Sequence, residues 1–132
     1  MIFSMTPEYF ETQFEDAGYG GQWPRQFAII TAYATTGEKW SPEDNAKADL
    51  ELQTELVRQG VWIQRVTGFS PRTGHAEPGW AVELSFSDAC DLGQSFRQDA
   101  IYVVRDDQLF VSHCDSRREE ILVGSFRERL RR

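Results

Sequence analysis

The sequence predicts an α/β or α+β sandwich, in which a mixed sheet of about five strands is flanked by helices. The segment "FAIITAY", residues 27–33, is a nearly continuous apolar run, which is typical of a central strand covered on both faces. Two later segments begin with capping residues and carry apolar residues at helical spacing. Short apolar or alternating runs follow these helices, so we expect the order α-β-α-β-β-α-β-β with a tail.

The first element is predicted to be a helix that begins at Thr6-Pro7-Glu8. Threonine caps a helix start, proline fits the first turn, and an acidic residue stabilises the positive end. Apolar residues then recur at helical spacing at Phe10, Phe14 and Ala17. Glycines at 18, 20 and 21 end this helix, so residues 1–23 are expected to form an N-terminal helix and loop.

A second helix is predicted after the 27–33 strand. Ser41 is its cap, and Gly60 is a natural C-terminal cap after Arg58. Ala48, Leu52 and Leu56 form one apolar stripe along it. The segment "VWIQRVTGF", residues 61–69, then alternates in the manner of a strand.

The second half of the chain repeats this logic. "WAVELSF", residues 80–86, predicts a strand, and Ser87-Asp88 begins a helix with apolar residues at positions 89, 92, 93 and 96. "AIYVV" and "QLFVS" flank Arg105-Asp106-Asp107, which predicts a hairpin turn. Residues 113–132 form a tail that we expect to be mainly helical, or to contain a short strand at 121–123 before the helix. The whole chain, residues 1–132, is expected to be a single domain.

Composition limits the classes of function. The chain has 132 residues, 40% of them hydrophobic, and a net charge of -7 from 21 acidic and 14 basic side chains, which favours a folded acidic globule. The charge pattern disfavours binding of nucleic acid, because the one basic cluster is the terminal Arg127, Arg129, Arg131 and Arg132. Two cysteines do not make a disulfide framework, and no run is long enough to span a membrane. We therefore expect a cytoplasmic protein with reduced thiols.

The tripeptide His75-Ala76-Glu77 matches the start of the zinc deaminase signature. That chemistry also needs a helix at the motif and a P-C-x-x-C segment, whereas Pro78-Gly79 follows here and Cys90 and Cys114 stand alone. Cys90 lies on the apolar side of its helix, which favours a core position over a nucleophile. The sequence therefore predicts no metal and no cofactor, and the lack of a complete catalytic set favours a protein that is not an enzyme.

Polar residues gather where the first two strands end and in the loop 68–80 between the second and third strands. If those two strands are parallel, their carboxyl ends meet at one edge, where open α/β sheets bind ligands. Such a cleft would suit a small anionic or nucleotide-like ligand bound by arginine, histidine and hydroxyl groups. The alternative is that these side chains only cap the loop. The candidate residues are Thr31, Tyr33, Thr67, Ser70, Arg72, His75 and Glu77.

Three segments together resemble the bacterial domain family of unknown function DUF3293. They are "FAIITAY" with the helix that contains Asn45, then "GFSPRTGHAEPGW", then "LGQSFRQDAIYVV", so the resemblance covers about residues 24–112. It implies no known activity, and it adds Gln98 to the candidate binding residues. The positions that correspond to the family pattern are Thr31, Tyr33, Asn45, Ser70, His75, Glu77, Gln98 and Ala100.

The sequence thus favours binding of a small polar or nucleotide-like ligand at loop 68–80, where His75 or Glu77 would act as acid or base if a reaction occurs. The second hypothesis is a protein-interaction or regulatory accessory module, for which Trp23, Trp40 and Trp80 would be the anchors. A hydrolase or transferase ranks last.

Overall fold

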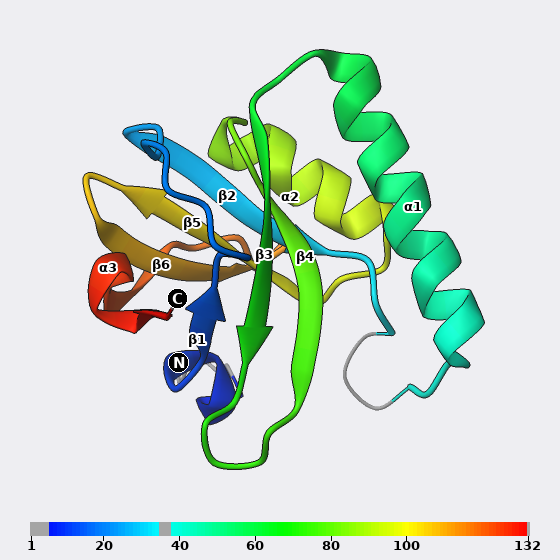
Figure 1. The fold of residues 1–132 in the computed structure, drawn as a ribbon, viewed down its shortest axis with the longest axis horizontal. Helices are drawn as coiled ribbons and strands as arrows, with labels where there is room; N and C mark the ends of the chain where they lie inside the picture. The colour runs from blue at the N-terminus through cyan, green and yellow to red at the C-terminus, as the bar shows by residue number, and fades with distance from the viewer. Residues whose placement is uncertain (1–5, 35–37, 132) are drawn as a thin grey trace.

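The computed structural model describes residues 6–34 and 38–131 of the chain. Within those residues, eight strands form one sheet in the order β7-β6-β5-β2-β4-β3-β1-β8 (Figure 1). Only the β1–β8 pair is parallel, and every other pair is antiparallel. The strands are β1 (Gln13–Glu15), β2 (Gln26–Thr31), β3 (Ile63–Phe69), β4 (Ala76–Val82), β5 (Ala100–Arg105), β6 (Gln108–His113), β7 (Ile121–Ser125) and β8 (Leu130–Arg131). The helices are the 3-10 helix η1 (Pro7–Phe10), α1 (Pro42–Gln59), α2 (Phe86–Ser95) and α3 (Phe126–Arg129).

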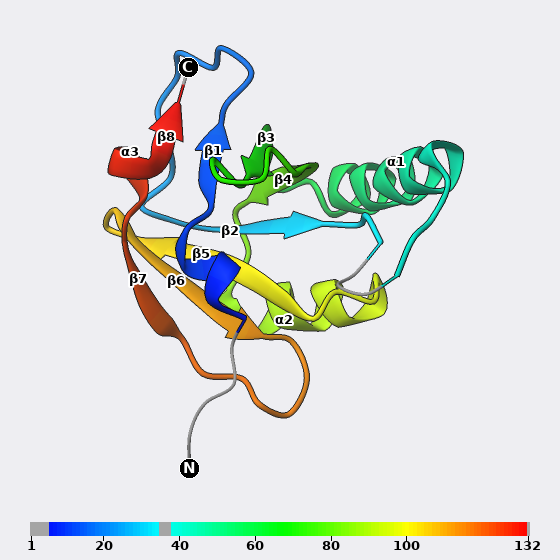
Figure 2. The ribbon, with the colours of Figure 1, turned by 90° about the horizontal axis from the view of Figure 1, so that it is seen from below.

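The sheet is strongly curled. Its two edge strands, β7 and β8, are joined by the single turn of α3, so the opposite edges of the sheet must lie close together. Figure 2 shows the strands bending around a concave face, while α1 and α2 both lie on the other side. The curl is therefore closed by α3 and leaves one concave inner face and one helix-covered outer face.

Alternation along each strand divides the core between these two faces. In β2, Ala28 and Ile30 belong to the outer cluster with Leu52 and Leu56 of α1, whereas Phe27 and Ile29 belong to the inner cluster. Strand β5 follows the same pattern: Ile101 and Val103 face out, and Tyr102 and Val104 face in. Both faces of the central strands are thus buried, which explains why "FAIITAY" is almost continuously apolar.

The middle of the predicted order is confirmed, since β2, α1, β3, β4, α2, β5 and β6 follow one another as expected. The predicted number of about five strands is wrong, because both ends of the chain add strands. Residues 6–23 form η1 and β1 rather than a helix, and β1 pairs with β3 and β8. The tail is not mainly helical, but its expected strand at 121–123 is present as β7, followed by a helix of only four residues, α3, and then by β8. At both ends of the chain, pairing with distant strands determined the structure more strongly than the helical spacing of apolar residues. Residues 1–5 and 132 of the predicted ends lie outside the described residues.

The interval between β3 and β4 is shorter than predicted, because β4 begins at Ala76 instead of Trp80. The loop is residues 70–75, and Glu77 lies within a strand. Pro78 is compatible with this strand because β4 pairs with β2 only from Gly79 onward, so the Pro78 position is an edge on that side. Gly79 allows the close pairing, since a Cβ atom there would lie 2.7 Å from the carbonyl oxygen of Ile30.

Strands β2 and β3 run in the same direction, because each is antiparallel to β4, which lies between them. Their carboxyl ends therefore reach the same end of the sheet, although they do not pair directly. Helix α1 makes this crossover, and its predicted caps are confirmed: Ser41 accepts from the Asp44 amide, and Gly60 is left-handed with φ 72°.

Side chains also fix α1 to the sheet. The Asp49 carboxylate accepts two hydrogen bonds from Arg65 at 2.9 and 2.6 Å and one from the Trp80 indole at 3.2 Å.

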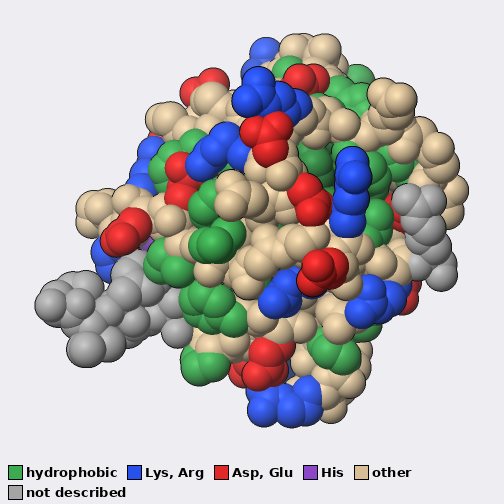
Figure 3. Space-filling view, turned by 90° about the vertical axis from the view of Figure 1, so that its left-hand side faces the viewer, with side chains coloured by type: hydrophobic (Ala, Val, Ile, Leu, Met, Phe, Trp, Pro, Cys, Tyr) green, Lys and Arg blue, Asp and Glu red, His purple; other side chains and the backbone are tan. Residues whose placement is uncertain are grey.

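The surface agrees with the charge pattern of the sequence. Figure 3 shows acidic and basic side chains interspersed over the face that lies at the left of Figure 1. None of the helices within residues 6–34 and 38–131 has the length and apolar character needed to cross a membrane.

Candidate functional site

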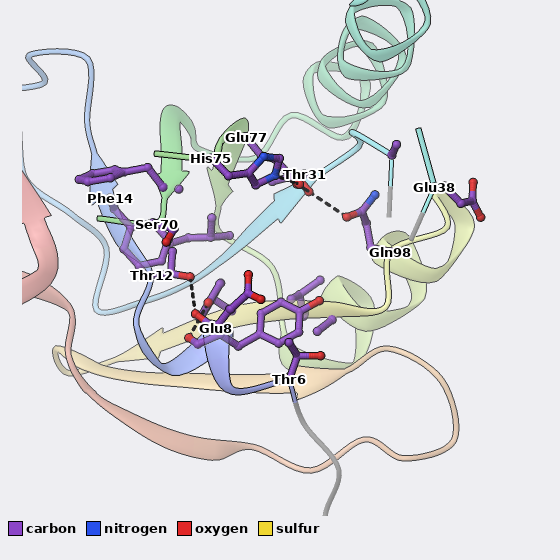
Figure 4. Close-up of a pocket in the computed structure, with 18 residues that line it drawn as sticks. Thr6, Glu8, Thr12, Phe14, Thr31, Glu38, Ser70, His75, Glu77 and Gln98 are labelled. Atoms are coloured by element: carbon purple, nitrogen blue, oxygen red, sulfur yellow. Dashed lines mark hydrogen bonds and ion pairs between the residues drawn. The ribbon is translucent and has the colours of Figure 1, made fainter. Parts of the chain in front are cut away.

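A cavity of about 320 Å³ lies against the concave face of the sheet, at the end where β2 and β3 finish (Figure 4). Its volume is at the lower limit of the range typical of small-molecule sites. Residues from η1, β1, the strand ends and the segment before β5 line it. They are Thr6, Glu8, Tyr9, Thr12, Phe14, Ile29, Thr31, Ala34, Glu38, Gly68, Phe69, Ser70, His75, Glu77, Gln98, Ala100, Ile101 and Tyr102.

Strand alternation explains why polar residues reach this cavity. Thr31 is two residues after inner-face Ile29, and Glu77 is four residues before inner-face Ala81, so both point to the concave side. Tyr102 occupies an inner position of β5. The pairing of Thr31 with Gly79 places the end of β2 two residues from Glu77 along β4.

A fixed set of hydrogen bonds joins Thr31 to Gln98. The Thr31 hydroxyl donates to Oε1 of Gln98 at 2.8 Å, with a longer contact of 3.4 Å to the Glu77 carboxylate. The Gln98 amide nitrogen in turn donates to the carbonyl oxygens of Tyr33 at 2.8 Å and Phe96 at 3.2 Å. Because both ends of the Gln98 amide are engaged, its orientation is defined and its donors are directed to the backbone.

His75 and Glu77 form a pair at the start of β4. Nε2 of His75 lies 2.9 Å from Oε2 of Glu77, and the side chains are 71% and 30% exposed, respectively. The β3–β4 loop that carries His75 is ordered by its own backbone, since the Ser70 amide donates to the His75 carbonyl and the Gly74 amide to the Ser70 carbonyl, both at 2.8 Å. The partly buried carboxylate is thus held by a more exposed imidazole.

The N-terminal segment forms the opposite wall. The Tyr102 hydroxyl donates to the carbonyl oxygen of Tyr9 at 2.6 Å, and the Thr12 hydroxyl donates to that of Glu8 at 3.2 Å. Burial raises the pKa of Tyr102 above its usual range, and the negative charge of Glu77 acts in the same direction. Tyr102 is therefore a neutral hydrogen-bond donor at the floor of the cavity, and its proton is directed to the backbone of η1.

The charged residues that line the cavity are acidic, whereas the sequence predicted an arginine that would bind an anionic ligand. The acidic residues that line it are Glu8, Glu38 and Glu77, of which Glu38 points its carboxylate away from the cavity and accepts from the Trp40 indole, and no lysine or arginine is among the described residues that line the cavity. Arg72, which was expected to bind an anionic ligand, instead forms an ion pair with Glu11 at 3.0 Å and is 66% exposed. An anionic ligand is therefore poorly matched to this lining.

Five of the eight candidate binding residues line this one cavity: Thr31, Ser70, His75, Glu77 and Gln98. Arg72 does not, and Tyr33 contributes only the carbonyl oxygen that anchors Gln98. Thr67 is not among the lining residues either, because its alternation within β3 opposes that of inner-face Val66. Sequence reasoning missed Tyr9, Phe14 and Tyr102. Alternation along β5 could have indicated Tyr102, but the other two depend on the β1–β3 pairing.

The cysteines lie elsewhere. Cys90 and Cys114 are free and fully buried in the outer cluster, as predicted for Cys90, and His75 is at the cavity on the opposite face. Across residues 6–34 and 38–131, no group of three or more histidine, cysteine, aspartate or glutamate side chains could hold a metal ion.

Comparison with known families agrees with the resemblance in the sequence. The model of DUF3293, described as a protein of unknown function, matches residues 30–101. The chain belongs to the DUF3293 family. No curated protein and no solved structure matches this DUF3293 chain.

The matched region begins near the end of β2 and ends in β5, so it contains all eight candidate binding residues. It also contains Asn45, whose side-chain oxygen accepts from the Ala34 amide at 2.9 Å and holds the segment after β2 against α1. The η1 and β1 residues that form the opposite wall lie outside the match. In this DUF3293 protein the cavity therefore combines strand ends from the family region with a wall from the N-terminal segment.

Proposed function

We propose that this protein binds a small polar molecule in the cavity at the ends of β2 and β3. The observation that carries the proposal is the convergence of Thr31, Ser70, His75, Glu77 and Gln98 on one concavity of about 320 Å³. Small-molecule sites are typically concave, mostly apolar, supplied with a few oriented polar groups, and common in the mouths of barrel-like sheets. The curled sheet provides such a mouth, and β1 and η1 provide one side of it.

The polar groups of the site are oriented before any ligand arrives. Gln98 is fixed by Thr31 and two backbone carbonyls, and Glu77 is fixed by His75. A ligand therefore meets groups whose side-chain entropy has already been lost, which favours affinity. Phe14, Phe69 and Tyr102 supply apolar contact area around these groups.

The proposal is tested by a thermal-shift screen of metabolites, nucleosides and nucleotides, followed by amide chemical shifts in NMR spectra. We expect a hit to shift the amides of Thr31, Glu77 and Gln98 and to lose affinity in Glu77→Ala. The matched control is Glu51→Ala, because Glu51 is an exposed residue of α1, on the other face of the sheet. Hits that shift only residues outside the cavity would refute the proposed site.

The alternative of a protein-interaction module finds less support. Trp80, one of its expected anchors, is only 7% exposed, lies under the Arg65 guanidinium and donates to Asp49. The centroid of the Trp23 ring lies 5.2 Å from that of Phe27 and 5.2 Å from that of Phe126. These rings are engaged in the fold.

A further inference from the structure

We propose that the ligand of this cavity is a small organic cation, an ammonium or guanidinium group on an apolar body, with Glu77 as its counter-charge. The inference rests on the proposed function and adds the chemical class of the ligand. It replaces the anionic ligand suggested by the sequence.

The first support is the sign of the charged lining. Glu77 projects from β4, and Figure 4 shows the Glu8 side chain pointing from η1 toward the strand ends that carry Thr31 and Glu77. Among the described residues, no arginine or lysine lines the cavity to neutralise them, and the nearby Arg72 is paired with Glu11 outside it. Two carboxylates on different sides of a concave, partly apolar surface favour a positively charged occupant.

The second support is the balance of hydrogen-bond donors and acceptors. The Thr31 hydroxyl is committed to Gln98, and the Tyr102 hydroxyl to the carbonyl oxygen of Tyr9. Both donors on the Gln98 nitrogen are directed to backbone carbonyls. Most of the oriented donors are therefore in use, whereas the oxygens of the Glu77 carboxylate have several lone pairs and, among the residues that the structure describes, accept only from His75 and, weakly, Thr31. The ligand must bring donors, as an ammonium or guanidinium group does.

The third support is the apolar part of the lining. Tyr9, Phe14, Phe69 and Tyr102 line the same cavity, and the Tyr9 and Tyr102 rings meet edge to face with centroids 6.2 Å apart. Aromatic faces attract cations as well as apolar groups, so these rings fit both parts of such a ligand. The cavity volume of about 320 Å³ limits the ligand to a small molecule.

The experiment compares matched probes that differ only in the charged group. Phenethylamine, phenethyl alcohol and phenylacetate share one body, and butylamine, butanol and butyrate form a second series. Each is titrated into the full chain, and the amide shifts of Thr31, Glu77 and Tyr102 are followed by NMR. We expect an amine to bind about tenfold more tightly than its alcohol, and the carboxylates to bind least. Glu77→Gln, which keeps the shape and removes the charge, is expected to abolish this preference, whereas Glu51→Gln is expected to keep it.

The outcomes separate the two proposals. If alcohols or carboxylates shift the cavity amides as strongly as amines do, the site binds small molecules but the inference about charge is wrong. If Glu77→Gln leaves the amine preference intact, Glu77 is not the counter-charge and the inference is also overturned. If neither the probes nor the metabolite screen shifts the cavity amides, both the inference and the proposed function fail.

Discussion

The hydroxyl of Thr31 donates a hydrogen bond to Oε1 of Gln98 at 2.8 Å, although 67 positions separate the two residues in the sequence. The bond joins the end of β2 to the segment between α2 and β5. Through Gln98 it extends to the carbonyl oxygens of Tyr33 and Phe96. One glutamine thus joins the end of β2 to the segment between α2 and β5 beside the cavity.

Replacement of Thr31 by valine tests this connection. Valine keeps the shape of threonine and removes the donor, so Oε1 of Gln98 loses its partner, and we expect the free energy of unfolding to fall by about 1 kcal/mol. Urea denaturation measures the change. Thr54→Val is the matched control, because the exposed Thr54 hydroxyl only donates to the Leu50 carbonyl within α1. Equal losses in the two variants would show that the Thr31–Gln98 bond contributes nothing specific.

Asp49 is expected to be the most sensitive position of α1. Its carboxylate binds the Arg65 guanidinium and the Trp80 indole, and the Asp49 and Arg65 side chains are only 12% and 33% exposed. Asp49→Ala removes the carboxylate of a partly buried arginine, which keeps only the Gly79 carbonyl oxygen, and the acceptor of an indole N–H, which we expect to cost about 2 to 3 kcal/mol in urea denaturation. Glu51→Ala on the exposed side of the same helix should change stability by less than about 0.5 kcal/mol. A loss for Asp49→Ala no larger than that of Glu51→Ala would contradict this role.

These contacts show what the sequence could predict. The caps at Ser41 and Gly60 and the hairpin at Asp106 and Asp107 are set by local chemistry, and all were expected. In the hairpin both residues have positive φ, 49° and 71°, as a two-residue turn between antiparallel strands prefers. Local patterns sufficed at these positions, whereas α2 begins at Phe86 with Ser85 as its cap and not at the expected Ser87.

The local pattern of the N-terminal segment did not indicate its structure. Phe10 and Phe14 have helical spacing, yet Phe14 is a buried strand residue because β1 fills the edge beside β3. Only the curl of the sheet brings η1 over the strand ends, so the second wall of the cavity depends on pairings between distant segments. The residues after β3 could be predicted as a site, whereas Tyr9 and Phe14 opposite them could not.

The two buried thiols are expected to make the free energy of unfolding depend on pH in the alkaline range. Burial raises the pKa of Cys114 to about 12 and also raises that of Cys90. In the unfolded chain a thiol has a pKa of about 8.5, so above that pH the unfolded state loses protons that the native state keeps. Stability is therefore expected to be unaffected by the thiols at lower pH and to fall as the pH rises from the unfolded pKa toward about 12.

Urea denaturation at about pH 8 and about pH 10 measures this fall. We expect Cys114→Ala, which lacks one of the two thiols, to lose less stability than the wild type between these pH values. Tyr102, whose pKa burial also raises, contributes equally in both proteins, so the comparison isolates the thiol. An identical fall in the two proteins would exclude Cys114 as a source of the pH dependence.

Arg129 of α3 is predicted to hold the N-terminal wall of the cavity in place. Its Nη1 donates to the carbonyl oxygens of Phe10 at 2.9 Å and Thr12 at 3.1 Å, which fixes the segment between η1 and β1. In Arg129→Met the apolar stem is retained and both hydrogen bonds are lost. We expect the free energy of unfolding to fall by about 1.5 to 3 kcal/mol and amide hydrogen exchange in β1 to accelerate. Arg127→Met is the control, because the Arg127 side chain is 82% exposed and its ion pair with Asp107 is long, at 4.0 Å. If exchange in β1 were as slow in Arg129→Met as in Arg127→Met, the β1–β3 pairing alone would hold this wall. A faster exchange confined to η1, β1 and β8 would instead show that the single turn of α3, by closing the curl of the sheet, also completes the cavity.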